Sequence, residues 1–365
     1  MIGAGALAVR GILPHLTQAD VRASVRVQAV CDPAPGRAQE AARRFSIPAS
    51  FTSVREMLDR GEVDAVTIAS PIGLHYDHGL QSLLAGKHVH FNKTMTTTVA
   101  EATELIELAR ERGLRIVASP GEVLRPHNRR ARELIAEGAI GTLAWAICGA
   151  SFGTYHEDES ERDEPLGAQP VDPSWYYRKP GGGPLYDMTV YSLHALTSVL
   201  GPARRVTALS GVRVPERRFK GRTVATEADD STILALDFGD NLFAVAYGTP
   251  AAETPSFFPS YFGTTGRITD DLLNGEPFDY PGRELTRDAP ELWARISWAL
   301  PHVIGVHRDI DEHHVFEDIM QLVDWIAEGR PSPVSPEHAR HVIDIIESGY
   351  RAAETGETQR LATTF

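Results

Sequence analysis

The sequence predicts an α/β protein: an N-terminal doubly wound parallel sheet of the Rossmann type, followed by an α+β domain with a large, mostly antiparallel sheet. Three observations carry this prediction. A glycine-rich turn opens the chain, short apolar runs alternate with amphipathic segments in the first third, and longer segments of alternating polarity follow. A chain of 365 residues exceeds what a single core usually supports. We therefore expect two domains, 1–120 and 121–365.

Strands and helices are expected to alternate in the first domain. The predicted strands are Val25–Cys31, Ala65–Ala69, His88–Phe91 and Arg115–Ala118. The predicted helices are Gly36–Phe45, Val54–Arg60, His78–Ala85 and Val99–Arg112. Right-handed crossovers between parallel strands place a ligand crevice at the carboxyl ends of the strands.

The second domain is expected to contain successive strands with short connections, a pattern typical of antiparallel pairing. Its predicted strands are Thr142–Ser151, Arg205–Val212, Ser231–Phe238, Leu242–Gly248 and Ser260–Ile268. Its predicted helices are Leu185–Leu200, His313–Glu328 and Pro336–Glu354. The acidic, irregular stretch Tyr155–Asp172 is interpreted as a loop over the site.

Composition excludes several classes of protein. The 49 acidic residues outnumber the 36 basic ones, giving a net charge of −13, which argues against a nucleic-acid partner. No apolar run reaches the length of a membrane span, and no secretory signal opens the chain. Cys31 and Cys148 are isolated, so we expect reduced thiols and a cytoplasmic location.

The opening turn, Gly3-Ala-Gly5-Ala6-Leu-Ala8, fits the dinucleotide-binding pattern G-x-G-x-x-G/A. Gly3 allows the tight turn, and Gly5 lets the backbone approach a pyrophosphate at the N-terminus of the helix that follows; Ala6 is predicted to lie at the cofactor with them. The small residue Ala8 permits close packing of this helix on the sheet.

Asp32 ends the predicted strand that follows the glycine-rich turn. Its carboxylate can accept hydrogen bonds from ribose hydroxyls and would repel the extra phosphate of NADP, which predicts NAD as the cofactor. NADP remains an alternative cofactor, because the guanidinium of Arg37 could pair with that phosphate. The alternative interpretation is that Asp32 is only a turn residue before Pro33.

Only Met1 and Ile2 precede the glycine-rich turn, although a Rossmann sheet needs a strand there. We therefore expect that the natural start lies a few residues upstream, or that the chain was trimmed.

Several further motifs appear in a fixed order along the chain. They are the run from Val63 through Ser70 and Pro71 to His75, Ala85-Gly-Lys-His-Val, Asn92-Lys93-Thr94, Gly181-Gly-Gly-Pro-Leu-Tyr-Asp187 through Tyr191 to His194, and Ile345-Ile-Glu-Ser-Gly-Tyr-Arg. Together they resemble the glucose–fructose oxidoreductase/inositol dehydrogenase/MocA family over essentially the whole chain. The resemblance implies an NAD(P)-dependent oxidoreductase, with Ser70, Pro71, His75, Asn92 and Lys93 at the cofactor.

The chain departs from the family at Asn92 and Thr94, which replace the glutamate and proline of its Glu-Lys-Pro tripeptide. Asn92 can still hydrogen-bond the nicotinamide ribose, but without charge. Because a cis bond before a residue other than proline costs about 3 kcal/mol, we expect a trans peptide between Lys93 and Thr94.

Asp187, Tyr191 and His194 are spaced i, i+4 and i+7, so one helix would present them as a stripe. Hydride transfer from a carbinol needs a base for the hydroxyl proton and a cation for the developing alkoxide. Lys93 fits the second role, and a share in the first is left open. Tyr191 is the predicted proton acceptor, since a neighbouring ammonium would lower its pKa, and Asp187 is predicted to hold Lys93 or a substrate hydroxyl.

His194 is interpreted as a substrate ligand or as the base itself, with a packed core histidine as the alternative. Trp175 and Arg178 are predicted substrate contacts, because aromatic faces and guanidinium donors suit a polyhydroxylated ring. The alternative is an aromatic cluster in the domain core. No metal is expected: Asp311-Glu-His-His314 and Glu317 offer ligand types, but adjacent residues face different sides of a helix.

The sequence therefore predicts an NAD-dependent dehydrogenase or reductase, with NADP possible, that acts on a hydroxyl or keto carbon of a sugar, cyclitol or glycoside. A homodimer or homotetramer is expected from the resemblance, through the open faces of the second-domain sheets. Two alternatives remain: a redox-assisted glycosidase or lyase that retains its NAD, and a non-catalytic NAD-binding regulator.

Overall fold

The computed structural model describes residues 1–153, 172–219, 221–254, 257–286 and 296–365. Contacts divide the chain into two compact units. Unit 1 contains Met1–Pro120 and Pro301–Pro336, and unit 2 contains most of the remaining described residues. The stretch Pro301–Pro336 departs from the predicted division, because helix α9 (His313–Glu328) packs against strands of the parallel sheet.

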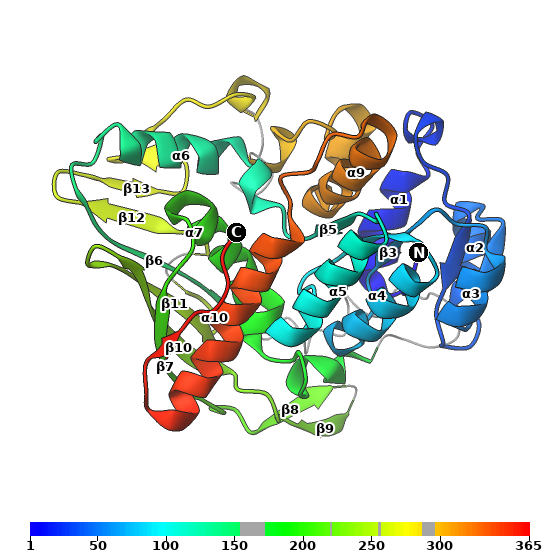
Figure 1. Cartoon of the computed structure of the whole chain (residues 1–365), viewed down its shortest axis with the longest axis horizontal. Coiled ribbons are helices and arrows are strands. Elements are labelled where there is room, and N and C mark those ends of the chain that lie inside the picture. The colour runs from blue at the N-terminus through cyan, green and yellow to red at the C-terminus, as the bar shows by residue number, and fades with distance from the viewer. Residues whose placement is uncertain (154–171, 220, 255–256, 287–295) are drawn as a thin grey trace. The chain divides into compact units, whose positions relative to one another are not determined.

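Unit 1 is a Rossmann-type parallel sheet with helical connections (Figure 1). Its strands are β1 (Ala29–Cys31), β2 (Ala49–Phe51), β3 (Ala65–Ile68), β4 (His88–Phe91) and β5 (Ile116–Ala118). Its other α-helices are α1 (Leu13–Leu16), α2 (Arg37–Phe45), α3 (Val54–Arg60), α4 (His75–Leu84) and α5 (Val99–Glu111). Short helical turns are η1 (Ala8–Ile12), η2 (Val21–Ala23), η3 (Ile72–Leu74) and η9 (Gly305–Asp309).

The chain start occupies the centre of this sheet. Ile2 forms parallel bridges to Cys31 and to Ile68, and so joins the β1–β2 pair to the β3–β4–β5 group. Ile2 is 1% exposed, and the Met1 amino group donates to the Ala29 carbonyl at 2.8 Å. The bridges of Ile2 thus bring the glycine-rich turn to the carboxyl end of the sheet.

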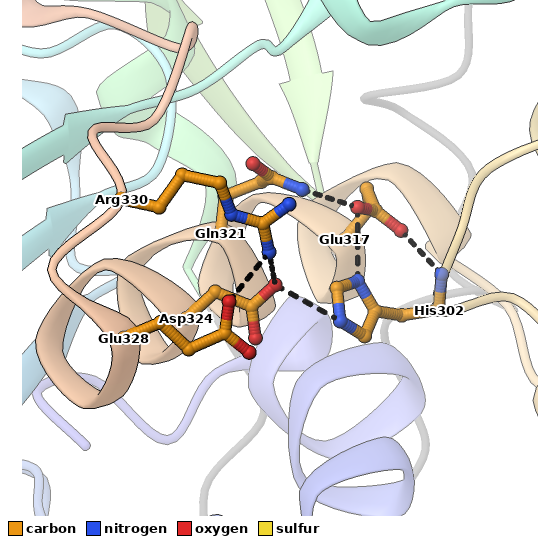
Figure 2. Close-up of polar contacts among 6 residues, drawn as sticks. All are labelled: His302, Glu317, Gln321, Asp324, Glu328 and Arg330. Carbon is orange, nitrogen blue, oxygen red and sulfur yellow. Dashed lines mark hydrogen bonds and ion pairs between the residues drawn. The ribbon is translucent and has the colours of Figure 1, made fainter.

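Helix α9 is fastened to the segment that precedes it by a buried carboxylate (Figure 2). Glu317 is fully buried and accepts hydrogen bonds from the His302 backbone N–H at 2.8 Å and from Gln321 Nε2 at 2.8 Å. The His302 ring bridges Glu317 (3.0 Å) and Asp324 (3.4 Å). Burial alone would lower the pKa of His302, but the two carboxylates outweigh it and the net shift is upward.

Unit 2 is built on a nine-stranded sheet of order β15-β14-β13-β12-β6-β11-β10-β7-β16, in which only β6 and β11 pair in parallel. Its strands are β6 (Leu143–Ser151), β7 (Arg205–Gly211), β10 (Ser231–Gly239), β11 (Leu242–Thr249), β12 (Ser260–Gly263), β13 (Arg267–Thr269), β14 (Leu272–Leu273), β15 (Glu276–Pro277) and β16 (Gln359–Arg360). A separate hairpin contains β8 (Glu216–Phe219) and β9 (Arg222–Ala225). The predicted fold class is confirmed.

The helices of unit 2 are α6 (Pro126–Ala136), α7 (Val190–Leu200) and α10 (Pro336–Thr355), with the short turns η4 (Glu122–Leu124), η6 (Pro173–Tyr177), η7 (Leu185–Thr189) and η8 (Arg283–Thr286). Helix α7 and turn η7 pack on one face of the large sheet, and α6 packs against α7. Turn η7 packs on β6 and β11, and Gly349 of α10 lies against Leu234 of β10. Along β10 and β11, residues of this buried face alternate with less buried residues of the opposite face. No described helix is long and apolar enough to cross a bilayer.

Several predicted elements differ from the structure, among them the helix predicted at His78–Ala85, which begins at His75. The first strand begins at Ala29 rather than Val25. The predicted strand Ser260–Ile268 is a hairpin, because the chain reverses where the Gly263 N–H donates to the Gly266 carbonyl at 2.8 Å. The predicted helix Leu185–Leu200 starts with a π-helical turn, and the α-helix begins at Val190. The acidic loop predicted at Tyr155–Asp172 lies, apart from Asp172, outside the described residues.

Candidate active site

The glycine-rich turn is held tightly against the neighbouring loop of unit 1. Gly3 has φ +91°, and a Cβ there would lie 2.6 Å from the Ala69 carbonyl oxygen. Its N–H donates to the Cys31 carbonyl at 2.8 Å. Gly5 faces open space, with no atom within 4 Å of where a Cβ would stand, and the helical stretch begins directly after it at Ala6. A side chain is excluded at Gly3 by the protein itself, whereas at Gly5 the space is open.

Asp32 organises this turn from the end of β1. Its carboxylate accepts hydrogen bonds from the backbone N–H groups of Ala4 and Ala34, both at 2.9 Å, and from Arg37 at 3.2 Å. The hydrogen bond from the Ala34 N–H is a local turn contact, as expected if Asp32 is a turn residue before Pro33. A carboxylate offers about four acceptor positions, so three partners leave room for a hydroxyl donor. The Arg37–Asp32 ion pair was not predicted, and it partly neutralises the charge that would repel a phosphate.

The Asn92-Lys93-Thr94 segment leaves the carboxyl end of β4. The Asn92 N–H donates to the Ile68 carbonyl at 3.0 Å, which continues the pairing of β4 with β3. Asn92 is 7% exposed, and its Oδ1 accepts no hydrogen bond from the described residues. Lys93 is half-buried. The Lys93–Thr94 peptide is cis, so the expectation of a trans bond was wrong; bonds at Asn92 N and at the Thr94 carbonyl fix the backbone on both sides.

His75 lies between two loops and is fully buried. Its Nδ1 is 2.8 Å from the Thr94 carbonyl oxygen, and its Nε2 is 2.8 Å from the Ser70 carbonyl oxygen. Burial lowers its pKa to about 4. Because both ring nitrogens face backbone carbonyls and no ring atom is exposed, the predicted direct contact with the cofactor is not available to this side chain.

Ser70 and Pro71 follow the carboxyl end of β3, beside Gly3. Ser70 is half-buried, Pro71 is exposed, and Ser70 Oγ lies 2.9 Å from Nδ1 of His78. Their contact with the cofactor stays a prediction. Both residues follow the carboxyl end of a parallel strand, which is where such sheets bind their ligands.

In unit 2, the start of helix α7 carries the motif residues. Asp187 is 1% exposed within the π-helical turn η7, and its N–H donates to the Gly183 carbonyl at 3.2 Å. Turns of this kind often occur at functional sites. Tyr191 is 9% exposed and lies 6.0 Å, centroid to centroid, from the ring of Phe257. The roles predicted for Asp187 and Tyr191 stay predictions.

His194 has the surroundings of a core side chain. It is 2% exposed, and its ring lies 4.6 Å from that of His338, which is bonded in turn to Thr197 Oγ1 at 2.7 Å. Burial, helped by the nearby His341, lowers the pKa of His194 to about 3. A neutral, enclosed imidazole favours the packed core histidine over a substrate ligand or base.

The aromatic segment before the triple glycine is tied to Asp187 by the backbone. Trp175 and Tyr176 stack at 3.7 Å and are half-buried, and Arg178 is exposed. The Gly183 N–H donates to the Tyr176 carbonyl at 2.8 Å, so Gly183 links Tyr176 to Asp187. A Cβ at Gly183 would lie 2.6 Å from the Asp229 carbonyl oxygen, which requires glycine. Tyr176 was not singled out from the sequence, and its ring forms a stacked pair with that of Trp175.

Two family profiles match the chain. The profile described as an oxidoreductase family with an NAD-binding Rossmann fold matches residues 1–119, and the profile described as the GFO/IDH/MocA C-terminal domain matches residues 128–269. The chain belongs to the Gfo/Idh/MocA family. The family predicted by resemblance is confirmed, and with it an oxidoreductase with an NAD-binding domain.

Curated relatives of this family are similar over much of the chain. An uncharacterized oxidoreductase of Synechocystis is 32% identical over 58% of the chain and 57% of its own length. The dTDP-3,4-didehydro-2,6-dideoxy-alpha-D-glucose 3-reductase of Streptomyces antibioticus is 28% identical over 74% of each chain. The scyllo-inositol 2-dehydrogenase (NADP+) of Bacillus subtilis is 25% identical over 88% of the chain and 86% of its own length.

A solved structure of levoglucosan dehydrogenase, in complex with NADH and levoglucosan, matches with a TM-score of 0.73. The match covers 99% of this chain and 98% of that one at 19% identity, a level that shows the shared fold.

The Gfo/Idh/MocA chain has residues that fit a dinucleotide in unit 1. Gly5 leaves open space at the N-terminus of a helix, where a pyrophosphate is favoured. The buried Asn92 Oδ1 lacks a donor among the described residues, and a ribose hydroxyl can supply one. Asp32 retains acceptor capacity. Among the described residues, no group of three His, Cys, Asp or Glu side chains could hold a metal ion.

Proposed function

We propose that this protein transfers hydride between a nicotinamide cofactor and a hydroxyl or keto carbon of a polyhydroxylated ring, such as a sugar, cyclitol or glycoside. One observation carries the proposal. Gly3 packs on Ala69 and Asn92 pairs with Ile68, so the nucleotide turn and the loop of Lys93 leave the same end of the parallel sheet. Bound nicotinamide would accept or donate the hydride.

Lys93 is proposed to stabilise the alkoxide that develops on the substrate carbon. An ammonium aimed at developing charge is among the strongest contributions a protein can make to such a step. Tyr191 is proposed to accept the hydroxyl proton, with Asp187 orienting a substrate hydroxyl or Lys93. We assign the proton transfer to Tyr191 rather than to His194, because burial lowers the pKa of His194 to about 3 and makes it a weak base.

The substrate class rests on two supports. The relatives' names include an inositol dehydrogenase and a deoxysugar reductase, and a structure of similar fold holds levoglucosan. The stacked pair Trp175–Tyr176, with the exposed Arg178 close by in sequence, offers an aromatic face and a donor of the kind that binds such rings.

We propose NAD as the preferred cofactor, because Asp32 ends β1 with acceptor capacity left for ribose hydroxyls. Arg37 keeps NADP as a second possibility. A cytoplasmic location is proposed from the isolated, buried cysteines Cys31 and Cys148.

We also propose that the protein is a homo-oligomer, a dimer or tetramer, which associates through the uncovered face of the nine-stranded sheet. Large apolar side chains stand exposed there: Trp145 (41%), Phe243 (51%), Ile233 (55%) and Leu209 (77%). Trp145 is the register partner of Phe243 and stacks on Phe262 at 5.0 Å. A second copy of the same face would bury these side chains symmetrically.

The test is a screen of purified protein with NAD and, separately, NADP against monosaccharides, inositols and glycosides, following reduced nicotinamide and released products together. We expect net reduction of NAD with one class of ring. Cleavage of a glycosidic bond without net reduction would overturn the dehydrogenase proposal in favour of a redox-assisted glycosidase or lyase. Cofactor binding without turnover of any substrate would favour a regulator.

A further inference from the structure

His75 connects two loops at the carboxyl end of the parallel sheet. Its ring nitrogens lie 2.8 Å from the carbonyl oxygens of Ser70 and of Thr94, which belong to the loops after β3 and β4. Ser70 adjoins the site of Gly3, and Thr94 directly follows Lys93.

The ring carries a single hydrogen for these two acceptors. Burial lowers the pKa of His75 to about 4, and the charge of nearby Lys93 acts in the same direction, so the imidazole is neutral at pH near 7. A neutral imidazole has one N–H donor, and its other nitrogen is an acceptor. Only one of the two carbonyls can therefore receive a hydrogen bond from His75 at a time.

Donation to Thr94 is the bond that would connect the loop of Lys93 to helix α4. Ser70 also contacts this helix through its side chain, with Oγ 2.9 Å from Nδ1 of His78. Donation to Ser70 would join residues only five apart in the chain, whereas donation to Thr94 joins segments 19 apart. A contact of the second kind fixes one loop relative to another.

We propose that His75 is a positioning residue, which fixes the backbone of Lys93 through a hydrogen bond from its Nδ1–H to the Thr94 carbonyl. This rests on the proposed role of Lys93 as the cation that stabilises the alkoxide. His75 reaches neither cofactor nor substrate, since it is fully buried. Its effect falls on the chemical step, because an ammonium displaced by about 1 Å can cost about 100-fold in rate.

The kinetic test uses three variants. In His75→Asn the side-chain amide can replace the Nδ1 donor, in His75→Gln it can replace the Nε2 donor, and His75→Ala removes both. We expect kcat to fall about 10- to 100-fold in His75→Ala and His75→Gln, with KM for NAD little changed, and to be largely retained in His75→Asn. Equal effects of Asn and Gln, or a loss confined to KM, would overturn the proposal.

A second test needs no turnover. In protein labelled with ¹⁵N-histidine, the His75 ring is expected to carry its hydrogen on Nδ1 at pH near 7, both without cofactor and with NAD. The signal is assigned by its absence in His75→Asn or, failing that, by its contact with Thr94. A ring protonated on Nε2 would overturn the inference even if the protein proves to be a dehydrogenase. If no ring substrate is oxidised while Nδ1 carries the hydrogen, the proposed function fails and the bond to Thr94 stands.

Discussion

The two sheets of this protein place their chemistry differently. Strands of the parallel sheet are three or four residues long and mostly buried, and every polar group of interest follows a strand end: Asp32, Ser70 and Asn92 with Lys93. In the nine-stranded sheet, strands β7, β10 and β11 run for seven to nine residues, and buried residues alternate with more exposed ones along most of their length. Its open face presents large apolar side chains.

The difference shows that the number of faces covered by helices determines which surface of a sheet is available to a ligand or a partner protein. A sheet covered on both faces offers only its ends to a ligand, which is where parallel α/β sheets bind them. A sheet covered on one face offers its other face to a partner. The predictions below test this division, beginning with the largest expected effect.

Replacing Lys93 should affect catalysis more than any other change at the parallel sheet. We expect Lys93→Ala to lower kcat about 100- to 1,000-fold, because the charge that stabilises the alkoxide is lost, while NAD still binds. Steady-state kinetics and a binding titration measure the two effects. Lys87→Ala, at the other end of the same sheet, is the matched control and should retain activity. Full activity in Lys93→Ala would contradict the mechanism.

Gly5 tests whether the end of the sheet approaches a pyrophosphate. Gly5→Val should leave the melting temperature of the cofactor-free protein unchanged, since nothing lies within 4 Å of the new Cβ. Affinity for NAD should fall about 10- to 100-fold, because hydrogen bonds to a charged group are lost. Gly211→Val, in equally open surroundings on β7, is the control. Normal NAD affinity in Gly5→Val would place the cofactor elsewhere.

Phe243 tests the open face of the large sheet. Phe243→Glu removes an apolar anchor and places a charge there, which should cost the assembly about 2 kcal/mol or more and shift it toward monomers. Light scattering after gel filtration measures the mass. Val306→Glu changes an exposed apolar residue in unit 1 and should leave the mass unaltered. If both variants keep the wild-type mass, this face is not the interface.

His302 tests how α9 is fastened, and the expected effect is the smallest. Because the pKa of His302 is raised on folding, its stabilising contribution is complete below the unfolded value of about 6.5 and is lost as pH rises through the folded value. His302→Gln should lower stability by about 1.5 kcal/mol near pH 6, and by less near pH 9.

Thermal unfolding at the two pH values measures this difference. Arg330→Gln is the control, because its ion pairs to Asp324 and Glu328 are exposed and should contribute little. A gap between wild type and His302→Gln that widens with pH would contradict the assignment.

Much of the fold was readable from the chain, because hydrophobic periodicity reports which face of an element is buried. The strand His88–Phe91 and the helix His313–Glu328 match the structure residue for residue. The turn at Gly263–Gly266 was missed, since apolar content continues through it. Strand β2 and the β8–β9 hairpin carry too few apolar residues to stand out.

Local sequence determined where the nucleotide turn lies, that Lys93 follows a strand end, and which family the motifs indicate, because those properties depend on neighbouring residues. Tertiary structure decided the rest. It placed α9 on the parallel sheet, gave His75 two carbonyls from separate loops, and enclosed His194 against His338. Each of the three depends on at least one segment distant in sequence, and a histidine's chemistry is set by burial and partners that such segments supply.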